Sequence, residues 1–89
     1  MLITFLGYQI LDFTNNDGEP IKGIKMYFMF PSEKRNYKGF EVASYFADYV
    51  REKILYDMIQ KCVPGERYQL DLIPSFSGKT KIESINPVK

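Results

Sequence analysis

Residues 2–30 read LITFLGYQILDFTNNDGEPIKGIKMYFMF, and this stretch decides the fold. Leu2 to Phe13 and Ile21 to Phe30 are rich in β-branched and aromatic residues, which favour extended strands. Thr14 to Pro20, between them, contains Asn-Asp-Gly, and these residues accept the positive φ angles of tight turns. Gly7 interrupts the first strand and indicates a bend or a bulge. The stretch is therefore predicted to form a β-hairpin.

Alternation gives the second strand of this hairpin two different faces. One face is uniformly apolar and is predicted to meet the core; it holds Ile24, Met26, Phe28 and Phe30. The opposite face holds Lys25, Tyr27 and Met29, which is a mixture of charged, aromatic and aliphatic side chains. That mixture is typical neither of a solvated surface nor of a core, so it marks a candidate binding surface.

A polar loop and a third strand follow. The loop covers Ser32 to Lys38, and the strand is predicted from Gly39 to about Phe46, with Phe40, Val42 and Phe46 on one side. A helix is then predicted from an N-cap at Asp48 to near Val63, where Pro64-Gly65 ends it. The apolar stripe of this helix repeats every four residues and is widened on one side; it consists of Val50, Ile54, Met58, Cys62, Leu55 and Ile59.

The C-terminal part of the chain predicts two more strands. RYQLDLIP, residues 67–74, alternates with Tyr68, Leu70 and Leu72 on one face. SFSGK, residues 75–79, reads as a hairpin connection, and TKIESI, residues 80–85, as the closing strand. The predicted order β-β-β-α-β-β is that of a single domain, residues 1–89, which is mainly β and folds as a five-stranded OB-like barrel. The alternative is a small α+β sheet with one packed helix.

Composition excludes several classes of function. The formal net charge of +1 argues against a protein that holds nucleic acid by total charge alone. The chain has no histidine and one cysteine, which excludes a Cys-His nucleophile pair and the usual zinc sites. We therefore expect no enzymatic activity, no cofactor and no metal, and a core position for Cys62. The lone cysteine fits a reducing cytoplasm, and no apolar run approaches the ~20 residues that a membrane span needs.

The barrel prediction turns the mixed face of the second strand into a nucleic-acid site. In an OB-fold the ligand lies across strands two and three and the loops beside them, and single strands are held by stacking rings and by cations. The candidate residues near these strands are Lys25, Tyr27, Met29, Lys34, Arg35, Tyr37, Lys38 and Tyr45. Phe76, at the predicted hairpin tip, and the neighbouring Lys79 and Lys81 extend the set.

Structural roles for the same residues stay open. Tyr27 is also explained by packing on a cross-strand neighbour, the basic loop by its contribution to solubility, and Met26 and Met29 as gap-filling side chains.

Residues Pro64 to Lys89, PGERYQLDLIPSFSGKTKIESINPVK, resemble the C-terminal portion of filamentous-phage helix-destabilising proteins. The shared features are a Pro-Gly entry, an alternating strand, a hairpin with an aromatic residue and a glycine, and an end in Pro, Val and Lys. The predicted helix around Tyr49 to Cys62 has no counterpart in these proteins. They are small OB-fold proteins that bind single-stranded DNA as cooperative homodimers. The resemblance implies that Tyr27 stacks on bases and that Phe76 supplies a ring near the groove or to a neighbouring dimer.

We thus expect a non-enzymatic single-stranded DNA-binding protein of phage or mobile-element type, with little sequence preference, acting in DNA replication or transfer. The expected partners are single-stranded nucleic acid, with DNA favoured over RNA, a second copy of the chain in a homodimer, and a replication protein; no membrane contact is expected. The alternative is a small protein-binding module, such as a phage-encoded inhibitor or an assembly adaptor, that uses the same aromatic face.

Overall fold

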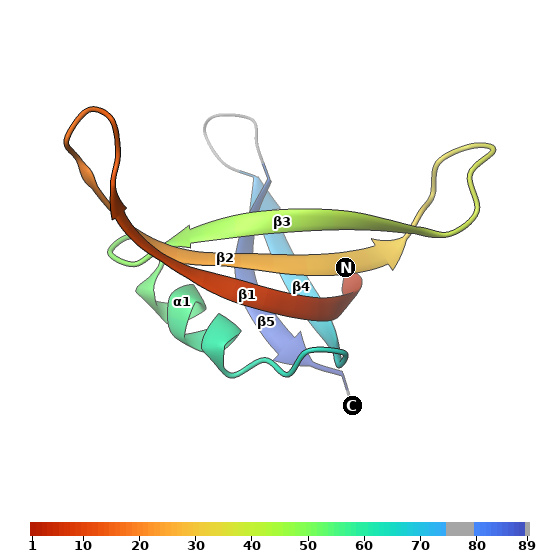
Figure 1. Ribbon diagram of the computed structural model, residues 1–89. Helices are drawn as coiled ribbons and strands as arrows, with labels where there is room; N and C mark the ends of the chain where they lie inside the picture. The colour runs from red at the N-terminus through yellow and green to blue at the C-terminus, as the bar shows by residue number, and fades with distance from the viewer. Residues whose placement is uncertain (75–79, 89) are drawn as a thin grey trace.

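The computed structural model describes residues 1–74 and 80–88 and shows a β-rich chain with one short helix. The elements are β1 Leu2–Thr14, β2 Pro20–Pro31, β3 Phe40–Asp48, α1 Lys53–Gln60, β4 Arg67–Pro74 and β5 Thr80–Pro87. This is the predicted element order. All five strands join one antiparallel sheet in the order β3-β2-β1-β4-β5 (Figure 1). Within the described ranges there is no helix with the length and apolar character needed to cross a bilayer.

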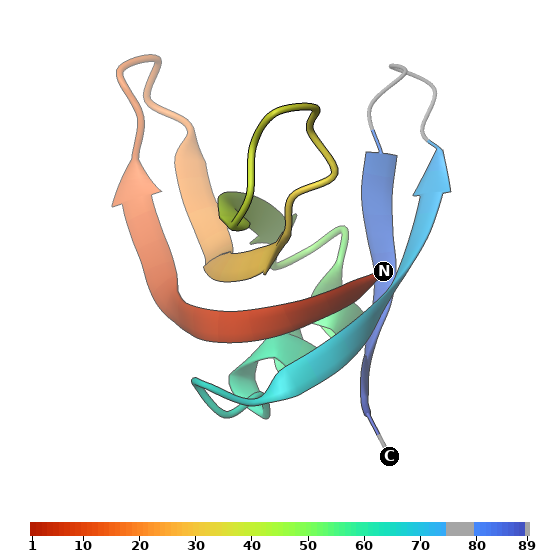
Figure 2. The same ribbon diagram turned by 90° about the vertical axis from the view of Figure 1, so that its right-hand side faces the viewer.

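The sheet is strongly curved. In Figure 2 the β1–β2 hairpin and the β4–β5 pair rise on opposite sides as two walls, and β1 runs along the floor between them. No ladder joins the described residues of β3 to those of β5, so these two strands are the edges of the sheet. Barrel closure, which the sequence predicts, is therefore not observed. The mainly β class, the five strands and their order around the helix are confirmed.

Local turn chemistry and one bulge shape the β1–β2 hairpin. The side-chain oxygen of Asn15 accepts hydrogen bonds from the backbone N–H groups of Asp17 and Glu19, at 3.0 and 2.9 Å. Gly18 has a φ of 80°, a conformation that glycine adopts without steric cost. The register of β1 against β2 shifts between Phe5 and Gly7. A bulge at this point increases the local twist and contributes to the curvature of the sheet.

One face of the sheet and helix α1 enclose the core. Along β2, Ile24, Met26 and Phe28 are buried and Phe30 packs against them, as the alternation predicts. Cys62 is a buried free thiol, which confirms its predicted core position. The remaining core residues come from β1, β3, α1, β4 and β5: Ile3, Phe5, Ala47, Leu55, Tyr56, Ile59, Leu70, Ile82 and Ile85.

Helix α1 begins later than the sequence predicts. Asp48 is the last residue of β3, not the N-cap. Its carboxylate accepts hydrogen bonds from the N–H groups of Val50 and Arg51, at 2.9 and 3.0 Å, and so stabilises the turn after the strand. The helix starts only at Lys53, because the chain first completes this turn.

The buried side of α1 also differs from the predicted stripe. Leu55, Tyr56 and Ile59 face the core, whereas Val50 and Ile54 are 83% and 78% exposed. Since Val50 belongs to the turn before the helix, the predicted four-residue repeat loses its first member, and the core-facing side is centred on Leu55 and Ile59.

A second bulge lies in β5. The register of β4 against β5 shifts between Asp71 and Leu72, so that Glu83 is the extra residue and Leu72 lies opposite the buried Ile82. Leu70 is buried, and Leu72 projects on the same side of the sheet but is 42% exposed. The predicted connection at residues 75–79 lies outside the described residues.

Candidate nucleic-acid interface

The side of the sheet away from the core carries the candidate site, and we call it the outer face. Residues directly opposite each other in a ladder project on the same side of a sheet. Lys25 lies opposite Gln9 of β1 and Phe46 of β3. The neighbouring rows continue on both sides of this one. The outer face is defined by the residues of these rows: Thr4, Gln9, Lys25, Tyr27, Met29, Val42, Ser44 and Phe46.

Phe46 lies over the backbone of Gly23. A Cβ atom at position 23 would be 2.7 Å from Cε2 of the Phe46 ring and would overlap its Cζ. Because Gly23 has no side chain, the Phe46 ring has room to lie over the backbone at this position. The Phe46 side chain stays 37% exposed, so the ring is held from one side and remains accessible from solvent.

Lys25 has an aromatic neighbour on its own strand and another on the adjacent strand of the outer face. Phe46 is the cross-strand partner of Lys25, and Nζ of Lys25 is 5.5 Å from the ring centroid of Tyr27. This distance is within the range of a cation–π contact. Phe46, Lys25 and Tyr27 are thus neighbouring residues of β3 and β2 on the outer face. The two rings can stack on planar groups, and the ammonium group of Lys25 can contact an anion.

Sequence reasoning does not include Phe46 in the site. The alternation of Phe40, Val42 and Phe46 has the pattern of a buried strand side, yet all three are exposed. The small residues Ala43 and Ala47 on the opposite side are the sequence feature that indicates which side of the strand faces the core. They leave room for close packing, and Ala47 is buried in the core while Ala43 packs against it.

Tyr45 does not join the outer face. In the β2–β3 ladder it lies opposite the core residue Met26, so it projects toward the interior. Its Oη donates a 2.9 Å hydrogen bond to Glu52. Burial, followed by the hydrogen bond and the charge of Glu52, raises the pKa of Tyr45 to about 12. The structure therefore separates Tyr45 from Lys25, Tyr27 and Met29, which it brings together.

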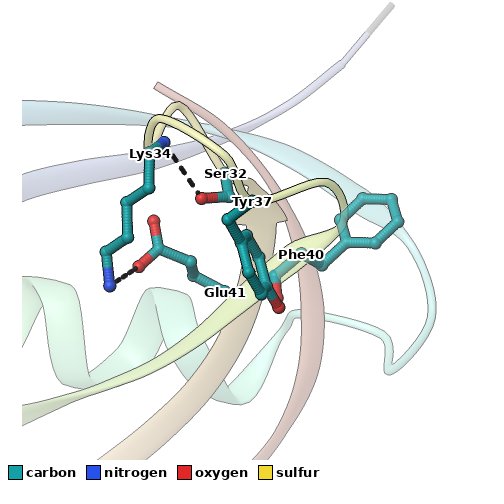
Figure 3. A network of polar contacts seen from close by, with 5 residues as sticks. All are labelled: Ser32, Lys34, Tyr37, Phe40 and Glu41. Atoms are coloured by element: carbon teal, nitrogen blue, oxygen red, sulfur yellow. Dashed lines mark hydrogen bonds and ion pairs between the residues drawn. The ribbon is translucent and has the colours of Figure 1, made fainter.

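The basic loop between β2 and β3 contains a closed ion pair. Figure 3 shows Nζ of Lys34 beside the Glu41 carboxylate, at 2.7 Å. This hydrogen bond raises the pKa of Lys34 and lowers that of Glu41. Glu41 lies opposite Phe30 on the core side of the ladder, so the pair points away from the outer face. Lys34 is therefore poorly placed for phosphate contact there.

The other loop residues remain solvent-accessible. Tyr37 is exposed and donates a 2.9 Å hydrogen bond to the carbonyl of Phe40, beside which it stands in Figure 3. Arg35 and Lys38 are exposed, and no carboxylate of the described chain lies within ion-pair distance of either. These two cations lie in the loop that leads into the start of β3 and are available to contact an anion.

Of the predicted C-terminal site residues, Lys81 is the one that the structure describes, and it is not on the outer face. Lys81 is exposed on β5 and, with Ile54, lines a shallow pocket beside helix α1. Phe76 and Lys79 lie outside the described residues.

A separate groove opens on the core side, between the basic loop and β4. It has a volume of about 790 Å³, and its walls combine apolar side chains with the Lys34–Glu41 pair. Its lining residues are Met1, Leu2, Phe30, Pro31, Glu33, Lys34, Glu41 and Leu72.

Metal-ligating side chains do not gather in groups of three or more anywhere in residues 1–74 and 80–88. Comparisons of the chain with protein-family models, with curated proteins and with solved structures find no match.

Proposed function

We propose that this protein binds single-stranded DNA along its outer face and has no catalytic role. The observation that carries the proposal is the succession of Phe46, Lys25 and Tyr27 across two adjacent strands. Each base stacked on an aromatic side chain contributes about 1–3 kcal/mol, so two rings supply useful affinity without a high net charge. Stacking accepts any base, which accounts for binding with little sequence preference.

An OB-like architecture is part of this proposal. An OB-fold is a five-stranded, partly open barrel that carries its ligand on strands two and three. The curved five-stranded sheet supports such an assignment, since the outer-face rings lie on β2 and β3 and, among the described residues, β3 and β5 are the free edges. The resemblance of residues 64–89 to phage helix-destabilising proteins supports a role in the replication or transfer of a phage or mobile element.

The test is a titration of labelled oligo-dT with the protein at two salt concentrations. Affinity is expected to fall with salt, with a slope of about 0.7 per phosphate contact for a single strand. Tyr27→Ala and Phe46→Ala should each weaken binding roughly 5- to 150-fold, which corresponds to the loss of one stacked base.

Tyr8→Ala is the matched control for these variants. Tyr8 is an exposed tyrosine in the same hairpin, but it lies opposite Met26 and projects on the core side of the sheet. Its removal should leave oligo-dT binding unchanged. If Tyr27→Ala and Phe46→Ala both fold, by circular dichroism, and bind as the wild type does, the outer face is not the site.

A protein-binding module is the second candidate, and exposed Val42 favours it. This side chain is 68% exposed where the outer face reaches the edge strand β3, and an aliphatic group packs against protein more readily than it stacks on a base. A protein that shows no oligo-dT binding at low salt would favour this second candidate.

A further inference from the structure

Strand β3 ends the sheet with an edge that no other strand of the described residues pairs with. It is nine residues long, and its charged residues are Glu41 and Asp48, close to its two ends. The segment between them contains no lysine, arginine or proline, which are the residues that protect natural edge strands from pairing. The other edge, β5, does carry such residues, namely Lys81 and Pro87. Of the two edges, β3 is therefore the one prepared to receive another strand.

We propose that β3 pairs with β3 of a second copy of this chain, antiparallel, about a two-fold axis at Ser44. This is the register that pairs all nine residues of the strand, since Ser44 is its central residue. Because side chains alternate, a two-fold axis at a residue places outer-face side chains opposite outer-face side chains. The outer faces of the two copies then form one continuous surface.

The cross-strand pairs of this register favour a second copy as the occupant. Val42 lies opposite Phe46 of the second copy, and a β-branched residue opposite an aromatic one is a stabilising pair. Glu41 lies opposite Ala47 of the second copy, and Asp48 opposite its Phe40. No two like charges are therefore directly opposed, and the strand is complementary to itself.

The pairing also has a consequence for strand binding. It aligns the Phe46–Lys25 row of one copy with the Val42–Met29 row of the other, so the outer faces join and a nucleic-acid strand could run from one copy onto the other. This consequence rests on the proposed function, whereas the pairing does not.

The first experiment measures mass in solution by size-exclusion chromatography with light scattering. The wild type should have twice the 10.4 kDa of one chain. Ser44→Lys places two ammonium groups opposite each other at the axis and should shift the mass to that of one chain. Thr80→Lys adds the same side chain to the β5 edge and should leave the dimer intact. Val42→Lys serves as the second edge variant should Ser44→Lys fail to fold.

The second experiment tests the register by cross-linking in a Cys62→Ala background. Opposed residues of antiparallel strands have Cα atoms about 4.5–5.5 Å apart, which suits a disulfide. Mild oxidation should link Ser44→Cys into a covalent dimer and leave Thr80→Cys monomeric. A mixture of Val42→Cys and Phe46→Cys proteins should form a mixed disulfide dimer.

A wild type that is monomeric at its highest attainable concentration overturns the pairing, as does a folded Ser44→Lys protein that remains dimeric. Oligo-dT titrations on the same samples separate the two proposals. A dimeric wild type that binds no oligo-dT contradicts only the proposed function, and a monomeric wild type that binds it contradicts only the pairing.

Discussion

The phenol of Tyr45 donates a 2.9 Å hydrogen bond to the carboxylate of Glu52 and so ties β3 to the residue before helix α1. The backbone of Ile82, in β5, also interacts with this phenol and opposes the rise of its pKa. Tyr45 thus reaches from one edge strand of the sheet toward the other, where no backbone ladder joins them. A side chain placed here stabilises the curved sheet in a way that a surface tyrosine would not.

Tyr45→Phe is therefore expected to destabilise the fold. The substitution keeps the ring in the core but removes the hydrogen bond, whose net contribution is about 0.5–1.5 kcal/mol. Urea unfolding followed by circular dichroism measures the change. Tyr37→Phe is the matched control, because its hydroxyl bonds an exposed carbonyl, and a change within about 0.5 kcal/mol is expected. Equal losses in the two variants would show that the Tyr45 bond has no special role.

The raised pKa of Tyr45 predicts a loss of stability at alkaline pH. The unfolded chain releases this proton near pH 10, whereas the folded protein holds it to about pH 12. The contribution is complete below about pH 10 and is lost as the pH rises toward about 12, because the unfolded state then binds fewer protons. The stability difference between the wild type and Tyr45→Phe should shrink over this range. A difference that stays constant from pH 9 to the top of the range would contradict the assigned pKa.

Gly23→Ala should destabilise the protein by disturbing the support of Phe46. The new Cβ would overlap both Cζ of the ring and the backbone carbonyl of Ala47. Overpacking of this kind costs about 1–3 kcal/mol, and the carbonyl cannot move without disturbing the β2–β3 ladder. Thermal unfolding of the single and double variants measures the effect. In a Phe46→Ala background the cost should be smaller, since one of the two overlaps is gone; an unchanged cost would mean that the ring is not the partner.

Two lysines that look equivalent in the sequence should differ in their effect on DNA binding. Lys25 lies beside the Tyr27 ring on the outer face, whereas Lys34 is paired with Glu41 at 2.7 Å on the other side of the sheet. Lys25→Ala should weaken oligo-dT binding and reduce the salt slope by about 0.7, as expected for one lost phosphate contact. Lys34→Ala should leave the slope nearly unchanged. A larger effect of Lys34→Ala would move the strand from the outer face to the loop.

The features of this fold that the sequence predicts are those that local chemistry determines. The β1–β2 hairpin follows from Asn15 and Gly18, whose turn conformation depends on neighbouring residues alone. The core face of β2 follows from period-two alternation, and so does the grouping of Lys25, Tyr27 and Met29. These features need no knowledge of distant contacts.

The remaining features depend on contacts that a local pattern does not contain. Asp48 has the sequence signature of a helix N-cap, yet the same carboxylate–amide bonds stabilise the turn that delays the helix. The bulge in β5 makes Glu83 an extra residue and sets Leu72 opposite buried Ile82, with no glycine or proline in the sequence at this point to indicate it. Tyr45 and Tyr27 both lie in aromatic strand segments, and only the β2–β3 register places them on opposite sides. Barrel closure likewise depends on β3 and β5, which are far apart in the chain.

Two substitutions in α1 test directly which side of the helix faces the core. Ile54 and Leu55 are neighbours in the sequence, and the predicted stripe contains both, but the structure exposes 78% of Ile54 and buries Leu55. Leu55→Ala should cost about 2–5 kcal/mol in urea unfolding, because it removes core volume beside Ile59. Ile54→Ala should change stability by no more than about 0.5 kcal/mol, because an exposed site loses little packing and alanine is the better helix former. Similar losses of stability for both variants would mean that the helix buries the wider stripe expected from the sequence. The turn at Asp48 would then be the first turn of the helix.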